Sequence, residues 1–321
     1  MSWEPEIAEL RRREALAYRM GGADKVERQH DNGKLTVRER IDRLLDEGSF
    51  HEIGAIAGKA AYDAAGELVD FLPSNFVMGR GRIDDRPVVV GGDDFTVRGG
   101  AMDAAIGSKQ VFAEQMANEL EIPIVRLVDG TGGGGSVKTI ETDGRTYVPY
   151  NQGWDWVVDN LAKVPVVGLG LGSIAGLGST RLVSSHYSVM VRETSQMFIA
   201  GPPLVARLGQ TLTKEELGGS DVHAKSGAID DVVDSEDEAF ARARRFLSYL
   251  PSSVFQLPPR AAPADPADRA DEWLIEAIPR DRRKVYDMRK ILRSVLDDDS
   301  FFEMGRRYGG STITGLARLN G

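Results

Sequence analysis

Two apolar segments, each followed by a glycine-rich turn, restrict the fold of this chain more than any other feature. They are IPIVRLVD (Ile122–Asp129) and VPVVGLGLG (Val164–Gly172). Near-continuous apolar runs are typical of parallel strands, because helices cover both faces of a parallel sheet. Stretches with a helical pattern lie between and after these runs, at residues 107–120, 151–164 and 236–250. Strands that alternate with helices predict an α/β fold with largely parallel strands.

A repeated segment predicts a duplicated domain. LLDEGSFHEIG (Leu44–Gly54) and VLDDDSFFEMG (Val295–Gly305) share six of eleven residues at a constant offset of 251. A second match follows in the same order, between VMGRGRIDD (Val77–Asp85) and ITGLARLNG (Ile313–Gly321). We therefore expect two copies of one domain, the second only begun. Two complete copies would need about 500 residues, so we also expect a fragment or a truncated product.

The pattern along the chain predicts four parts. Residues 1–35 are an N-terminal helical arm, with a helix over Trp3–Tyr18. Residues 36–255 are the first domain, which opens with a helix capped by Thr36 and Glu39 and includes a β-hairpin that turns at Asp84–Asp85. Residues 256–272 are rich in Pro, Ala and Asp and are predicted to be a linker. Residues 273–321 are expected to begin the second domain.

Composition excludes several classes of function. The net charge of −9 at pH 7 argues against nonspecific binding to nucleic acid. The chain has no cysteine, which excludes disulfides, thiolate metal sites and thiol nucleophiles. Residues 1–22 lack the apolar centre of a signal peptide, and the longest apolar run, residues 164–178, is too short and too rich in glycine to cross a bilayer. We therefore expect a cytoplasmic protein that binds neither nucleic acid nor a membrane.

The two glycine-rich turns, Asp129–Ser136 and Gly172–Thr180, are the best candidates for a binding site. Ligands of open α/β folds bind where loops leave the carboxyl ends of the strands, and backbone amides at a helix start can face an anion. Neither turn has the Lys-Ser/Thr pair of a phosphate-binding P-loop. A dinucleotide fingerprint on GLGLGS would lack its acidic residue. The turns therefore predict a shared oxyanion site.

Side chains for ordinary nucleophilic or metal chemistry are scarce. The four histidines are far apart in sequence and form no triad or metal motif, so no metal site is predicted: His30, His51, His186 and His223. Ser173 departs from a nucleophile elbow, because Ile174 and Ala175 both precede the next glycine. Most of the acidic residues are attributed to solvated helix faces and turns. If the chain is an enzyme, we expect a substrate or cofactor to supply the proton chemistry.

Several long segments resemble the carboxyltransferase (β) subunits of biotin-dependent acyl-CoA carboxylases, such as those of the propionyl-CoA carboxylase type. The resemblance is to the N-terminal part of those subunits and is dispersed over nearly the whole chain. The segments that carry it are LTVRERIDRLLDEGSFHEIG, GRGRIDDRPVVVGGDDFTVRGGAMDAAIGSKQ, VRETSQMFIAGPPLV, LTKEELGGSDVHAKSGAID and RRFLSYLP.

The resemblance implies a fold and a reaction. The fold is the ClpP/crotonase-like spiral of ββα units, and full-length members have two such domains, the first for the coenzyme A ester and the second for biotin. The reaction transfers the carboxyl group of carboxybiotin to the α-carbon of a short-chain acyl-CoA, with propionyl-CoA as the default, through an enolate held by backbone amides. The ureido anion of biotin removes the α-proton, so no side-chain base is required. Biotin is expected on a partner, a biotin carboxylase or biotin carboxyl carrier subunit, and the chain is expected to form homo-oligomers, trimers or hexamers.

The resemblance also implies where the oxyanion hole lies. In the family it is a small-Gly-Gly turn after the second buried strand, and its counterpart here is Ala175-Gly176-Leu177. The backbone amides of Gly176 and Leu177 are therefore the candidate catalytic donors, although leucine replaces the second glycine of the family pattern.

Substrate-binding candidates follow from the same resemblance. The first turn is commonly D-S-G-G-A-R in the family but lacks the serine and the arginine here, so Gly132 and Gly133 are expected only to line the acyl site. Gly99, Gly100 and Ala101 match the family's loop near the coenzyme, and Lys109 is a candidate for binding its phosphates.

Two alternatives remain open. One is a single-domain crotonase-like decarboxylase or hydratase that acts on acyl-CoA. Hydratases of that fold have glutamates beside the oxyanion turn, whereas residues 168–182 contain no acidic residue. The other is a non-catalytic assembly subunit, since an inert relative could change its glycine turns.

Overall fold

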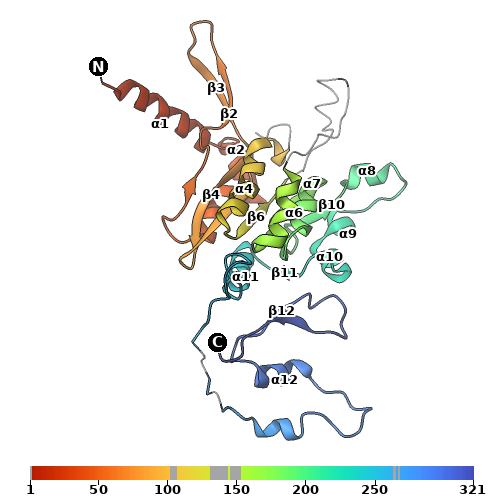
Figure 1. Ribbon diagram of the computed structural model, residues 1–321. Helices are drawn as coiled ribbons and strands as arrows, with labels where there is room; N and C mark the ends of the chain where they lie inside the picture. The colour runs from red at the N-terminus through yellow and green to blue at the C-terminus, as the bar shows by residue number, and fades with distance from the viewer. Residues whose placement is uncertain (1, 102–106, 131–143, 145–152, 263–264, 267) are drawn as a thin grey trace.

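The computed structural model describes residues 2–101, 107–130, 144, 153–262, 265–266 and 268–321. Its centre is a seven-stranded sheet in the order β1-β4-β5-β6-β7-β9-β11 (Figure 1). The first three strands, β1 (His51–Glu52), β4 (Phe76–Ile83) and β5 (Arg86–Asp93), pair antiparallel. From β5 onward the pairing is parallel, through β6 (Ile124–Val128), β7 (Val166–Gly170), β9 (Tyr187–Val191) and β11 (Asp231–Val233). The predicted α/β fold with largely parallel strands is confirmed.

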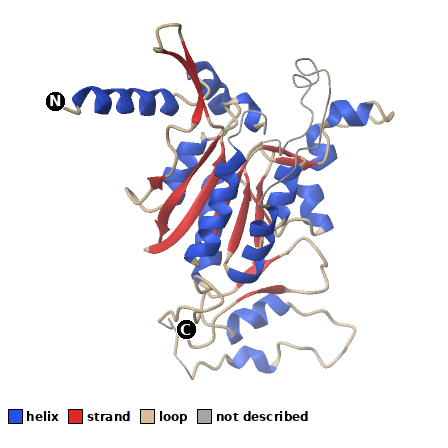
Figure 2. Ribbon diagram, turned by 45° about the horizontal axis from the view of Figure 1, so that its top comes forward, coloured by secondary structure: helices blue, strands red, loops and turns tan. Residues whose placement is uncertain are grey.

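Helices cover both faces of the sheet (Figure 2). On one face, α3 (Val37–Leu44) and α11 (Glu236–Ser248) pack on alternate residues of β5, β6 and β7. On the other face, α4 (Gly107–Leu120) and the segment after α6 (Trp154–Lys163) pack on the residues in between. All five residues of β6 and of β7 are buried, because both faces of these strands are covered.

Two of the predicted local signals have the expected geometry. The side chain of Thr36 accepts a hydrogen bond from the amide of Glu39, and the Glu39 carboxylate accepts one from the amide of Thr36, which completes a capping box at the start of α3. The β4–β5 hairpin turns at Asp84 and Asp85, whose φ angles of 50° and 63° lie in the left-handed region that this tight turn requires.

Shorter elements surround the carboxyl ends of the parallel strands. β8 (Ser173–Ala175) and β10 (Gln196–Phe198) form a two-stranded parallel sheet, and α7 (Leu177–Val183) follows β8. The other elements in this part are α8 (Pro202–Ala206), α9 (Lys214–Gly218), α10 (Ser220–Ser226) and the 3₁₀ turn η1 (Arg98–Gly100).

A β-hairpin that was not predicted from the sequence contacts the N-terminal arm. α1 (Glu4–Tyr18) confirms the predicted first helix, and α2 (Ala23–Asp31) follows it. A hairpin of β2 (Gly58–Tyr62) and β3 (Leu68–Pro73) projects from the body of the protein near α1 (Figure 1). Arg12 on α1 donates to the carbonyl of Leu68 at 2.8 Å, so the hairpin and the helix are joined.

The C-terminal part repeats the geometry of the first helix-to-strand unit. After the 3₁₀ turn η3 (Glu272–Ile275) it contains α12 (Met288–Val295), β12 (Phe302–Met304) and β13 (Thr314–Leu316). α12 begins and ends 251 residues after α3, and the residues that end the two helices, Leu45 and Leu296, both have a φ of −92°.

The hydrogen bonds and ion pairs repeat as well. Arg38 contacts Glu52 at 2.7 Å, and in their counterparts Nε of Arg289 lies 2.9 Å from Oε2 of Glu303. In each unit the glutamate is paired across the sheet with a glycine, Gly79 or Gly315. The predicted repeat is therefore confirmed at the level of backbone and side-chain contacts, while the domain boundaries stay predictions.

The repeated unit packs against the end of the central core. Phe302 on β12 is fully buried among three aromatic rings, with centroid distances between 5.2 and 6.2 Å to Tyr187, Tyr249 and Phe246. Arg242 on α11 donates to the carbonyl of Glu303 at 3.0 Å.

Candidate functional site

Three of the turns that the sequence analysis singled out meet at the carboxyl ends of β5, β6 and β7. A Cβ atom on Gly100 would lie 2.8 Å from the Cα of Gly130, so these two turns touch through their backbones. A Cβ atom on Gly172 would lie 1.9 Å from Oδ1 of Asp129, so only glycine fits there without a rearrangement. The carbonyl of Gly130 also accepts a hydrogen bond from the amide of Ala175 at 3.3 Å.

The start of α7 presents backbone amides beside this junction. Leu177 is the first helical residue, and the first intrahelical bond is the one from the amide of Thr180 to the carbonyl of Gly176 at 3.3 Å. Within the part of the chain that the structure describes, the amides of Leu177 and Gly178 have no hydrogen-bond acceptor. Ala175, Gly176 and Leu177 are half-buried, whereas Gly178 is buried.

The amide of Gly176 is arranged differently from the sequence-based expectation. It donates to the carbonyl of Phe198 at 3.1 Å, as an extension of the β8–β10 pairing. Gly176 itself has a φ of 59° and a ψ of −124°, a conformation that favours glycine. The amide of Gly176 is therefore already paired within the protein, and the amides of Leu177 and Gly178 are the ones at this turn that have no acceptor among the described residues.

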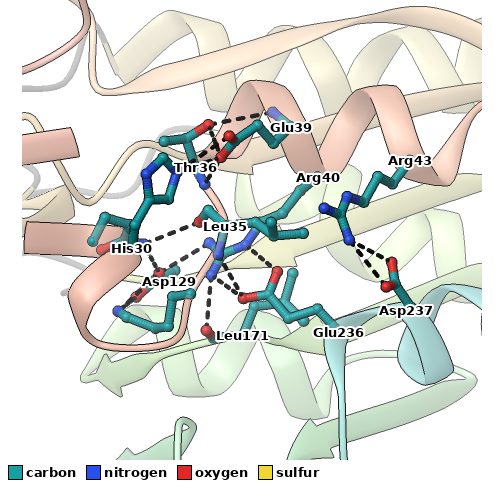
Figure 3. A network of polar contacts seen from close by, with 12 residues as sticks. His30, Leu35, Thr36, Glu39, Arg40, Arg43, Asp129, Leu171, Glu236 and Asp237 are labelled. Atoms are coloured by element: carbon teal, nitrogen blue, oxygen red, sulfur yellow. Dashed lines mark hydrogen bonds and ion pairs between the residues drawn. The ribbon is translucent and has the colours of Figure 1, made fainter. Parts of the chain in front are cut away.

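A buried ionic network surrounds the carboxylate of Asp129, at the end of β6 (Figure 3). The carboxylate of Asp129 is fully buried and accepts hydrogen bonds from Gln29 at 3.1 Å, Lys34 at 3.2 Å and Arg40 at 2.9 Å. Arg40, also fully buried, contacts both carboxylate oxygens of Glu236 at 2.7 and 2.8 Å. Two cations therefore face two carboxylates in the interior.

Burial and charge shift the pKa values in this network. Although burial opposes its charge, the carboxylates of Asp129 and Glu236 raise the pKa of Arg40 above its ordinary value. Burial lowers the pKa of Lys34, against the opposing effect of Asp129. Burial also raises the pKa of the nearby Asp93, although the guanidinium of Arg181, 3.3 Å away, works in the other direction.

The other candidate residues are distributed as follows. Gly99 and Gly100 have φ angles of 64° and 66°, and with Ala101 they form the turn that touches Gly130. Lys109 is 6% exposed, and its ammonium group donates to the carbonyl of Gly54 at 3.0 Å. It is therefore not displayed for coenzyme phosphates in this arrangement. Gly132 and Gly133 lie outside the described residues.

The histidines nearest the strands take part in backbone contacts. Nδ1 of His186 accepts from the amide of Val166 at 3.0 Å, and Nε2 of His223 lies 2.6 Å from the carbonyl of Met197. No group of His, Cys, Asp or Glu that could hold a metal ion is found among the described residues. Of the described helices, none is both long enough and apolar enough to span a bilayer.

The ionic network was not predicted from the sequence, because most acidic residues were attributed to solvated helix faces and turns. Asp129, Glu236, Asp93 and Asp94 are all buried, which corrects that interpretation. One sequence signal could have revealed Arg40. It lies within the apolar stripe of α3 formed by Val37, Ile41 and Leu44, and the residue 251 positions later is Ile291.

Comparison with known proteins agrees with this arrangement. The family described as carboxyl transferase domain matches residues 28–321. The carboxyltransferase subunit of propionyl-CoA carboxylase from Haloferax mediterranei is 32% identical over 323 residues, which cover 100% of this chain and 62% of that protein. The mitochondrial propionyl-CoA carboxylase beta chain of Homo sapiens is 33% identical over 320 residues, or 98% of this chain and 58% of that protein.

A solved structure gives the same result for the fold. Transcarboxylase 12S, solved as a hexamer with methylmalonyl-coenzyme A and methylmalonic acid bound, matches with a TM-score of 0.86 and 28% identity, over 100% of this chain and 62% of that one. The predicted crotonase-like α/β fold is confirmed by this likeness. The chain spans less than two thirds of the length of these relatives. It belongs to the carboxyl transferase domain family.

Proposed function

We propose that the chain is the acyl-CoA-binding part of the carboxyltransferase of a biotin-dependent acyl-CoA carboxylase, with propionyl-CoA as the default substrate. The relatives named propionyl-CoA carboxylase support this assignment, as does the transcarboxylase solved with methylmalonyl-coenzyme A. The observation that carries it is the pair of amides at Leu177 and Gly178 that have no acceptor among the described residues, beside the contact between Gly100 and Gly130.

These amides have the chemistry needed to hold a thioester oxygen. Removal of a proton from the α-carbon moves negative charge onto that oxygen, and N–H donors that point at it stabilise the enolate without having to reorganise. Gly100 and Gly130 have no side chains, which lets the two turns pack backbone to backbone beside these amides. Gly99, Gly100 and Ala101 are proposed to contact the coenzyme, and Gly132 and Gly133 to line the acyl site.

The described residues of the site fit a proton acceptor that comes from outside the chain. His186 and His223 are engaged with backbone atoms, and the carboxylate of Asp129 is held by three donors. Biotin, when carried into the site by a partner, would supply both the carboxyl group and the base that removes the α-proton.

The proposal includes partners and a location. We expect a biotin carboxylase and a biotin carboxyl carrier subunit as partners, and homo-oligomers of this chain. The hexamer of transcarboxylase 12S supports the last point. The cytoplasm is the proposed location.

Replacement of Leu177 by proline tests the role of the amide. Position 177 is the first residue of α7, where proline fits the helix and removes only an N–H that has no helical partner. A nitronate analogue of propionyl-CoA, which carries negative charge on its oxygens as the enolate does, should bind about 10 to 100 times more weakly to Leu177→Pro, because one hydrogen bond to a charged group is lost. Titration calorimetry measures the dissociation constants.

Leu177→Ala is the matched control, because it removes the same side chain and keeps the amide. It should bind the analogue within about threefold of the wild type. Equal affinity of the proline and alanine variants would contradict the proposed donor. Absence of heat with any coenzyme A ester would favour the non-catalytic subunit, and conversion of methylmalonyl-CoA to propionyl-CoA without biotin would favour the decarboxylase.

A further inference from the structure

Arg40 connects three segments that are far apart in the sequence. It lies on α3, more than 80 residues before either glycine-rich turn, yet its guanidinium contacts the end of β6, the end of β7 and the start of α11. We propose that Arg40 is a positioning residue that holds the turns after β6 and β7 in one arrangement and so sets the oxyanion site. This rests on the proposed function of those turns.

The contacts of Arg40 divide among three segments (Figure 3). Nη1 donates to Asp129, the residue after β6, at 2.9 Å. Nη2 donates to the carbonyl of Leu171, the residue after β7, also at 2.9 Å. Nε and Nη2 contact Glu236, the first residue of α11, at 2.7 and 2.8 Å. The planar guanidinium can make these contacts together because its donors point in fixed directions.

The contacts continue from Arg40 to the oxyanion turn without a gap. Oδ1 of Asp129 lies against Gly172, where no side chain fits. Asp129 is followed by Gly130, whose carbonyl accepts from the amide of Ala175. Ala175 is two residues before Leu177, which carries the proposed donor. A displacement of Asp129 would therefore move both sides of the site.

The second helix-to-strand unit shows that α3 does not need this arginine to form. α12 has the same length and the same C-terminal geometry as α3, and Ile291 stands at the position of Arg40. Each unit also keeps the arginine of its other ion pair, Arg38 or Arg289. The buried arginine is therefore particular to the unit that lies under the glycine turns.

General energetics agree with a positioning role. Two buried cations and two buried carboxylates are expensive to desolvate, and well-packed apolar residues often stabilise a fold as well or better. Such a network is most useful where it selects one arrangement of the surrounding backbone. Here that backbone is the pair of turns at the candidate site.

The test uses the full chain and a variant designed to fold. Arg40→Met alone would leave Glu236 charged and buried, so Arg40→Met is combined with Glu236→Gln, which is neutral and still accepts from the amide of Leu35. Asp129 keeps Lys34 and Gln29 in this double variant. Arg40→Lys keeps the charge but cannot reach all three segments. Arg43→Met is the control, since Arg43 pairs with Asp237 at the exposed side of the same helix.

For each variant, the test measures both the hydrogen exchange of the backbone amides and the affinity for the ligand. The double variant should unfold within a few degrees of the wild type. Its amides at 171–178 should exchange about ten times faster or more, while those of β9 are unchanged. Its affinity for the nitronate analogue of propionyl-CoA should fall about tenfold, with Arg40→Lys in between and Arg43→Met like the wild type.

Wild-type exchange at 171–178 in the double variant and in Arg40→Lys would overturn the proposal. Unfolding of the double variant together with wild-type exchange in Arg40→Lys would also overturn it, because the role would then be only structural. A third result would separate the two proposals. If exchange at 171–178 is faster in the double variant but the wild type binds no coenzyme A ester, Arg40 still positions the turns and the proposed function is refuted.

Discussion

Lys109 carries its ammonium group into a nearly buried position beside the first helix-to-strand unit. Burial lowers its pKa to about 8, although Glu52 nearby works in the opposite direction. The carbonyl of Gly54, which accepts its hydrogen bond at 3.0 Å, can be served by a neutral amine as well as by an ammonium ion. The lowered pKa of Lys109 therefore makes the free energy of unfolding depend on pH in one direction.

Replacement of Lys109 by methionine should change how stability depends on pH. Between about pH 8 and pH 10.5 the unfolded chain keeps a proton that the folded chain has released, so the free energy of unfolding of the wild type rises with pH. Below pH 8 both states are protonated and the penalty for burying the charge is complete. Between pH 7.5 and pH 10, the free energy of unfolding of the wild type should rise by on the order of 2 kcal/mol relative to that of Lys109→Met. Urea unfolding at the two pH values measures this, with Lys25→Met at an exposed position as the control.

If the difference in free energy of unfolding between the wild type and Lys109→Met stays constant over this pH range, the burial of the amine is contradicted. If the variant instead becomes more stable relative to the wild type as the pH rises, the downward direction of the pKa shift of Lys109 is contradicted.

The two helix-to-strand units show how neighbours decide the burial of an element. α3 and α12 have the same length, and their arginine–glutamate pairs correspond. Val37 and Leu44 on α3 are 1% and 0% exposed, because they pack between the sheet and α11. Their counterparts on α12, Met288 and Val295, are 39% and 55% exposed. The same local pattern thus gives the same helix but not the same packing.

The two ion pairs should accordingly differ in strength. Arg38 also stacks on the ring of Tyr18 at 3.9 Å, and its side chain is 16% exposed, whereas that of Arg289 is 33% exposed. Arg38→Met should lower the free energy of unfolding by about 2 to 3 kcal/mol, because Glu52 is left buried without a partner. Arg289→Met should lower the free energy of unfolding by clearly less, since water can reach Glu303 more easily. Denaturant unfolding followed by tryptophan fluorescence compares the two, and equal losses would contradict this ranking.

For the whole molecule, the pattern of apolar residues predicted the strands and helices of the fold better than it predicted the candidate site. The apolar runs at 122–129 and 164–172 identified β6 and β7, and the repeat identified α12 and β12. The hairpin of β2 and β3 was missed because most of its residues are exposed and leave no apolar alternation to recognise. Tertiary contacts, which a local pattern cannot contain, decide which carboxylates are buried.

The candidate site shows the same limit. The glycine turns were predicted, and the structure brings those at Gly100, Gly130 and Gly172 together. The hydrogen bond from the amide of Gly176 to Phe198 could not be predicted, because it depends on the pairing of β8 with β10 across 22 residues. Arg40 and Asp129 are 89 residues apart and meet only once the sheet and α3 are in place.

The central claim is that backbone amides at the start of α7 hold the oxygen of an acyl-CoA thioester. Isotope-edited infrared spectroscopy of propionyl-CoA labelled with ¹³C at the thioester carbonyl observes that oxygen directly. The carbonyl band should move to lower wavenumber on binding to the wild type and to Leu177→Ala, and it should move back toward its position in solution on binding to Leu177→Pro. A band that stays at its solution position when bound to the wild type, or that shifts equally in all three proteins, would contradict the account.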